Sequence, residues 1–139
     1  MNTALTLSSD SRMTAGVLLL TIVAVEYGGW FLLNIVRGKQ PKTEFQQAFF
    51  RAGHAHAGVL VILSLVTMIL ADAVHMNSWL TFFARNGTWI AAILMPTGFF
   101  LAAAGKGTTT PNRFIILLYL GIASLALGVL SLGIGLLTA

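Results

Sequence analysis

The sequence contains no cysteine and few charged residues, and each shortage excludes a class of protein. Without cysteine the chain has no disulfide, no thiolate nucleophile and no cysteine-bound metal. Charged residues make up 9% of the 139 residues, whereas a soluble domain carries about 25%. Because these charges are too few to cover a water-facing surface, we expect no separate soluble domain.

Apolar residues, by contrast, are abundant and are arranged in long runs. They make up 57% of the sequence, and a run of about 20 such residues can cross a hydrocarbon core of about 30 Å. The sequence predicts an all-α fold in which residues 1–139 form one up-down bundle of four transmembrane helices. The predicted helices cover about 14–36, 43–75, 87–104 and 111–137. We therefore expect a multi-pass protein of the cell membrane, whose first partner is the lipid bilayer.

Local patterns suggest where the helices begin. Thr43, followed three residues later by Gln46, forms a capping-box pattern and predicts the start of the second helix. Thr110 followed by Pro111 is typical of an N-cap and first turn, and predicts the start of the fourth. Pro96 inside the third apolar run is expected to kink that helix. Residues 1–13 are expected to form a flexible tail.

The excess of basic residues indicates membrane orientation and not nucleic-acid binding, because the cations lie in the connections between apolar runs. The loops after the first and third runs hold most of them: Arg37, Lys39, Lys42 and Lys106. The tails and the middle loop hold only Arg12 and Arg85. By the positive-inside rule, the basic loops face the cytoplasm and both termini are extracytoplasmic.

Several polar residues lie inside or beside the apolar runs, where ionisable groups are costly and tend to serve a function. Glu26 lies within the first run, and Arg51 stands at the mouth of the second with two histidines. The sequence predicts an intramembrane ligand-binding or proton-carrying site near the cytoplasmic half, made of Glu26, Asn34, Arg51, His54 and His56. No complete motif assigns a catalytic residue.

The two histidines are also candidate metal ligands. Histidines on membrane helices can ligate haem or copper, so His54 or His56 could hold either cofactor. On a regular helix, two residues correspond to about 200° of rotation, which directs the rings to opposite sides and prevents them from chelating one metal. The alternative is a pair of interfacial histidines that hydrogen-bond to carbonyl groups or lipid phosphates.

The fourth apolar run contains a seam of small residues at alternating spacings of three and four. These residues are Gly121, Ser124, Gly128, Ser131 and Gly135. Small seams let membrane helices approach closely, so this one predicts a packing surface. It could serve either within one bundle or between subunits, and we expect a homo-oligomer or a larger membrane complex.

One segment resembles known membrane proteins. Glu44-Phe45 and Phe50-Arg51-Ala52 are similar to the opening of the second helix in the MAPEG family. That resemblance implies four helices, outside termini and an enzyme of eicosanoid or glutathione metabolism. The family's asparagine and acidic positions are occupied here by Ala55 and Gly58. The segment FFRAGHAHAG also resembles that of bacterial four-helix integral membrane proteins, which implies a family but no function.

Four functions follow as alternatives. The first is binding of a small ligand or cofactor at the intramembrane polar site. The second is a structural or accessory membrane subunit that packs through the small-residue seam. The third is proton or ion translocation with Glu26 as the titrating group, and the fourth is a MAPEG-like membrane enzyme.

Overall fold

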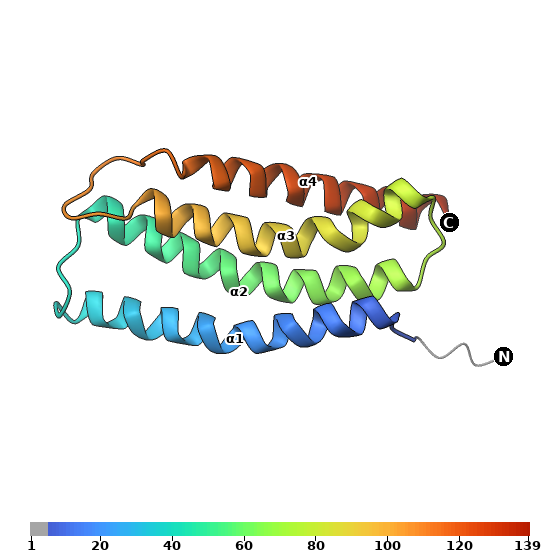
Figure 1. Ribbon diagram of the computed structural model, residues 1–139, viewed down its shortest axis with the longest axis horizontal. Coiled ribbons are helices and arrows are strands. Elements are labelled where there is room, and N and C mark those ends of the chain that lie inside the picture. Colours follow the sequence, from blue (N-terminus) through green and yellow to red (C-terminus); the bar gives the residue numbers. More distant parts are fainter. Residues whose placement is uncertain (1–5) are drawn as a thin grey trace.

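The computed structural model describes residues 6–139, which form four helices and no strand. The helices are α1 (Ser9–Val36), α2 (Glu44–Asp72), α3 (Ser78–Ala102) and α4 (Ile115–Thr138). They run alternately in opposite directions along one long axis, with the start of α1 and the end of α4 at the same end of the molecule (Figure 1). We call this the terminal end, and we call the opposite end, with connections 37–43 and 103–114, the loop end.

Three of the helices are long and apolar enough to cross a membrane: α1, α2 and α4. Their outer surfaces carry large apolar side chains that are mostly exposed, among them Leu20, Val23 and Leu137. Such faces are stable in lipid and costly in water. The prediction of an all-helical membrane-type protein is therefore confirmed at the level of four helices and three candidate spans.

Two helices begin earlier than the sequence predicts. α1 begins at Ser9, with Ser8 as its N-cap, so residues 9–13 are helical and do not belong to a flexible tail; residues 1–5 of that tail lie outside the described residues. α3 begins at Ser78 and not at 87, because Asn77 caps it by accepting the Leu80 N–H at 3.0 Å. Arg85, assigned to the middle loop from the sequence, therefore lies inside α3.

At the two predicted capping sites the outcomes differ. The capping box of Thr43 and Gln46 is present, which confirms the predicted start of α2. The predicted start of α4 at Thr110 and Pro111 is wrong, since α4 begins at Ile115 without a side-chain cap. Asn112 explains the delay, because its N–H donates to the Ala102 carbonyl at 3.0 Å and holds this stretch against the end of α3. Pro96 is buried within a continuous α3.

The small-residue seam of α4 packs within the bundle, against α3 and the segment before it. A Cβ on Gly121 would meet Met95, and one on Gly135 would meet the Met76 sulfur. Midway along, Gly128 lies against Gly87, and the Ser124 hydroxyl donates to the Gly87 carbonyl at 2.9 Å. The structure therefore places this seam between two helices of one chain.

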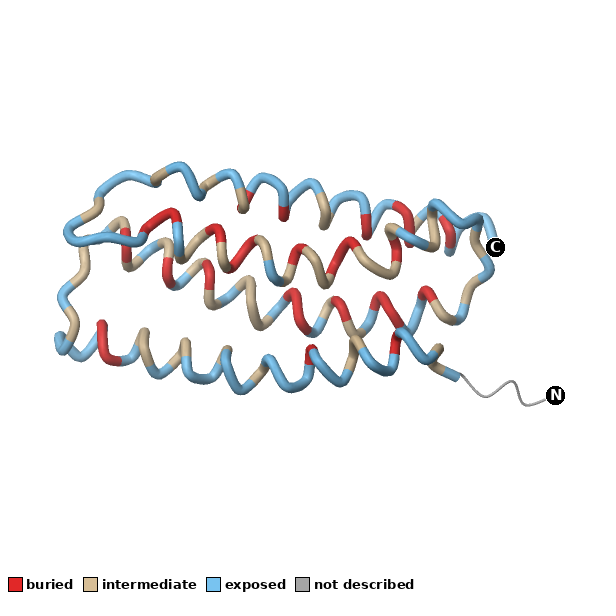
Figure 2. Tube along the Cα trace, viewed as in Figure 1, coloured by how far each residue is buried: buried red, intermediate tan, exposed pale blue. Residues whose placement is uncertain are grey.

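By comparison, α1 is attached more loosely. Most of its residues are exposed, whereas buried residues line the facing sides of α2, α3 and α4 (Figure 2). The buried residues of α1 are Ser11, Leu18, Asn34 and Ile35. Since α1 packs against α2, its side that points toward α3 is left open along much of its length.

A buried glutamine joins α2 to the α3–α4 connection at the loop end. The Gln46 side chain is 2% exposed, and its amide nitrogen lies 3.0 Å from the Ala103 carbonyl and 2.8 Å from the Gly105 carbonyl. It lies 2.8 Å from the Thr108 hydroxyl as well. Gly105 and Gly107 have φ values of +125° and +68°, which side chains other than glycine rarely tolerate, so the connection can turn back onto Gln46.

We expect Gln46→Leu to lower the free energy of unfolding by about 1–3 kcal/mol, because the buried Ala103 carbonyl and the Gly105 carbonyl would each lose a hydrogen-bond donor. Thermal unfolding in detergent micelles, followed by circular dichroism, measures this loss. The matched control is Gln47→Leu, whose side chain donates only to the Lys42 carbonyl from a half-buried position. Equal effects of the two substitutions would contradict a special role for Gln46.

Candidate functional site

A groove with a volume of about 510 Å³ runs between α1, α2 and α3. On α1 its lining extends from Met13 to Gly28, a rise of about 22 Å at 1.5 Å per residue. Ala57 and Val61 contribute from α2, and the wall on α3 extends from Trp89 to Phe100. Most of the lining is aliphatic or aromatic, so the groove suits a long apolar molecule.

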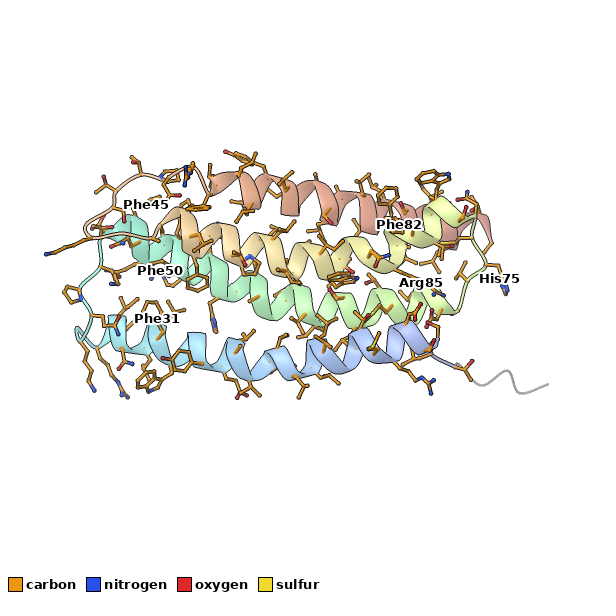
Figure 3. All side chains as sticks on the ribbon, viewed as in Figure 1. Phe31, Phe45, Phe50, His75, Phe82 and Arg85 are labelled. Atoms are coloured by element: carbon orange, nitrogen blue, oxygen red, sulfur yellow. The ribbon has the colours of Figure 1, made fainter. Side chains whose placement is uncertain are left out.

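An aromatic cluster lies at the loop end of the groove. The rings of Phe31 and Phe50 meet edge to face with centroids 5.6 Å apart, and Figure 3 shows them on neighbouring helices. Phe50 in turn stacks on Phe100 at 5.4 Å and an interplanar angle of 16°. Because Phe100 also lines the groove, this cluster gives the groove an aromatic end.

Among the described residues that line the groove, His54 is the one with an ionisable side chain, and it lies at this same end. It follows the first residue of α2 by ten positions, which places it about 15 Å along the helix. Its half-buried ring packs against two adjacent glycines of α1: a Cβ on Gly28 would come within 3.4 Å of Nδ1, and one on Gly29 within 3.3 Å of Cε1. The Gly28-Gly29 pair thus makes room for the imidazole.

Glu26 and Arg51 lie outside the groove. Each precedes a contact residue of the α1–α2 interface by three positions, Glu26 before Gly29 and Arg51 before His54. Because α1 and α2 are antiparallel, a residue three positions before such a contact lies on the same flank of the helix pair in both helices. Glu26 and Arg51 therefore share one flank. Both are exposed, and the Arg51 Nε donates to the Gln47 carbonyl of its own helix at 3.2 Å.

Asn34 and His56 are also separate from His54. The buried Asn34 amide donates to the Trp30 carbonyl at 3.1 Å. His56 donates from Nδ1 to the Ala52 carbonyl at 2.7 Å, and its ring lies 5.0 Å from that of Phe99 on α3. Of the five residues predicted to form one polar site, only His54 faces the groove.

The directions of the two histidine rings decide whether they can share a metal ion. His54 lies against α1 and His56 against α3, so the two rings face different helices, as their spacing indicates. Within residues 6–139, no group of three or more histidine, cysteine, aspartate or glutamate side chains could hold a metal ion. A haem or copper site would therefore depend on one histidine from this chain.

A polar junction near the terminal end joins three segments of the chain. The Asp72 side chain is 2% exposed; one carboxylate oxygen lies 2.6 Å from an Arg85 guanidinium nitrogen, and the other accepts the Ser8 N–H at 2.9 Å. Arg85 projects from α3 toward this junction in Figure 3. A small cavity of about 100 Å³, lined partly by Arg85 and Trp89, adjoins it.

Asp72 and Arg85 are not among the site residues predicted from the sequence. One signal could have found this junction, because Asp72 follows His54 by eighteen residues, which is five helical turns. Both residues are therefore on the face of α2 that meets α1. The partner Arg85 could not be identified in this way, since it depends on how α3 is placed.

Comparison with known proteins adds no relative. No protein-family model, curated protein or solved structure matches the chain. The resemblances to the MAPEG family and to the bacterial FFRAGHAHAG proteins therefore stay predictions, and the function must be argued from the groove and the residues that line it.

Proposed function

We propose that this chain is a multi-pass cell-membrane protein that binds a lipophilic small molecule in the groove between α1, α2 and α3. The His54 imidazole donates a hydrogen bond to the polar group of that molecule. One observation carries the proposal: the groove is lined almost entirely by apolar side chains, and His54 is its one titratable residue.

In this proposal all four helices cross the membrane. The 25 residues of α3 rise about 37 Å, enough for a hydrocarbon core of about 30 Å. Its one charged residue, Arg85, is paired with Asp72 near the terminal end. The basic residues Arg37, Lys39, Lys42 and Lys106 belong to the loop end, which we assign to the cytoplasm, with both termini outside.

The environment of His54 favours a ligand over empty space. At membrane depth there is little water to satisfy a polar group, and an unsatisfied one costs several kcal/mol. The Thr21 hydroxyl already donates to the Leu18 carbonyl, and the Trp89 indole donates to the Asn86 side chain. The Thr14 hydroxyl, also in the lining, lies about 21 Å from Gly28 along α1, near the terminal end, so the imidazole is the polar group best placed to bind a ligand at the loop end of the groove.

We expect Ala57→Phe to weaken binding by filling the floor of the groove. The probe is hexadecanol carrying a diazirine, added to purified protein in micelles, with labelled peptides identified by mass spectrometry. Labelling of α1 and α3 peptides should fall about tenfold, equivalent to about 1.4 kcal/mol of affinity. Ala126→Phe, on the exposed surface of α4, is the matched control and should leave labelling unchanged.

Two results would overturn the proposal. One is labelling spread over all four helices and insensitive to Ala57→Phe, which would indicate that the probe simply follows the lipid-facing surface. The other is a haem absorption band in the purified protein that His54→Ala removes, because the histidine would then be an axial ligand. A colourless protein with groove-specific labelling supports the proposal.

The other functions receive less support from the geometry. A proton path through Glu26 has no connection to the groove, since this side chain is exposed on the flank of α1. An accessory role through the α4 seam would need a second surface, because α3 covers that seam within the chain. Both stay predictions, as does a MAPEG-like enzyme activity.

A further inference from the structure

We infer that the molecule in the groove has a flat, uncharged ring with a carbonyl oxygen at its head and a long apolar tail, as membrane quinones have. This inference rests on the proposed function and names the class of ligand. It follows from three features of the groove: the charges near His54, the shape of the groove at the loop end, and the length of the groove.

The lack of a nearby cation argues against a ligand with an ionised head group. A carboxylate or phosphate at membrane depth needs a cation beside it. Of the basic side chains nearby, Arg51 faces the opposite flank and folds back onto the Gln47 carbonyl. The described lining holds no lysine or arginine side chain, so an imidazole N–H there matches an uncharged acceptor such as a carbonyl oxygen.

The shape of the groove at the loop end favours a ligand with a flat ring. Phe100 and His54 line this end together, and Phe100 is itself stacked on Phe50 at 16°. Aromatic rings gain about 0.5–1.5 kcal/mol from such pairings beyond the area that they bury. The missing Cβ atoms of Gly28 and Gly29 let the imidazole pack against α1, which holds the His54 ring beside this end of the groove.

The remaining length of the groove suits an apolar tail. The α1 wall of the groove is about 22 Å long between Gly28 and Met13. This length exceeds half the thickness of a hydrocarbon core, which is about 15 Å, so the groove is long enough for an extended apolar tail. Val17 and Ile93 lie along this stretch, together with Ala24. With its head at His54, the ligand would extend its tail toward the terminal end, along the opening between α1 and α3.

Competition against the diazirine–hexadecanol probe tests the inference. Decylubiquinone and dodecanol have comparable apolar tails, but only the first carries a carbonyl ring. We expect decylubiquinone to block labelling at a concentration about tenfold lower than dodecanol, a difference of about 1.4 kcal/mol. His54→Leu and Phe100→Leu should both abolish this advantage, whereas Phe82→Leu, an exposed position far from the groove, should keep it.

The outcomes separate the two proposals. If decylubiquinone and dodecanol compete equally well in the wild-type protein, the quinone-like head is wrong, while the groove still binds lipophiles. If the advantage survives in His54→Leu, the assigned head position is wrong. If the probe labels no groove residue at all, the proposed function itself fails. Retained probe labelling in the two groove variants shows that they are folded.

Discussion

Gly87→Ala is expected to lower the free energy of unfolding by about 3 kcal/mol, although it adds a single methyl group. The added Cβ would lie 2.6 Å from the Gly128 Cα and 2.6 Å from the Ser124 carbonyl oxygen. Both are backbone atoms of α4, so α3 and α4 would have to move apart to relieve the overlap. That movement would also break the hydrogen bond from the Ser124 hydroxyl to the Gly87 carbonyl. Thermal unfolding in micelles, followed by circular dichroism, measures the effect.

Two glycines elsewhere in the helices provide the control. Apart from the chain neighbours and the nearby backbone of the same helix, no described atom lies within 4 Å of a Cβ on Gly58 or Gly133. Alanine is favoured over glycine in a helix by about 1 kcal/mol, so Gly58→Ala and Gly133→Ala should raise the unfolding midpoint or leave it unchanged. If Gly87→Ala proved as stable as these variants, the close approach of α3 and α4 at this point would be refuted.

A comparable loss of about 3 kcal/mol is expected for Asp72→Asn, because it leaves the Arg85 guanidinium without its counter-ion. Asparagine can still accept the hydrogen bond from the Ser8 N–H, so the substitution mainly removes the charge. Since Asp72 joins the start of α1 to α2 and α3, the loosened element should be the first turn of α1. Amide hydrogen exchange of residues 9–13, together with the unfolding midpoint, measures both effects.

A double-mutant cycle isolates the ion pair. Arg85→Gln alone should also destabilise, and the double variant Asp72→Asn/Arg85→Gln should recover part of the summed loss, because no unpaired charge remains. The control is Glu44→Gln, which removes an exposed carboxylate from the first turn of α2 and should cost about 0.5 kcal/mol. Strictly additive losses would show that Asp72 and Arg85 do not interact.

Features of the fold that depend on a few neighbouring residues could be predicted from the sequence. The Thr43–Gln46 capping box is one, because both partners lie within one helical turn. The start of α4 could not be predicted in the same way, since Asn112 is held by backbone groups at the end of α3. The early start of α3 could not be predicted, because Arg85 was assigned to the middle loop and its partner Asp72 lies on another helix.

The candidate site shows the same division. His54 could be singled out because an ionisable residue in an apolar run is unusual, and its orientation opposite to His56 follows from helical spacing. The groove could not be predicted, because it depends on the distance between α1 and α3. Glu26 was grouped with His54 because both are ionisable residues in apolar runs, yet a rotation of α1 that the sequence does not reveal turns it to the other flank.

The loose attachment of α1 has a consequence for biosynthesis. Helices α1 and α2 leave the ribosome first, but they supply only two walls of the groove. The third wall, from Trp89 to Phe100, belongs to α3, which is held in turn by the glycines of α4. A nascent chain that ends after α2 therefore has no site to occupy. If the groove binds a ligand as we propose, that ability is acquired only when α4 has packed onto α3, so binding would report that assembly is complete.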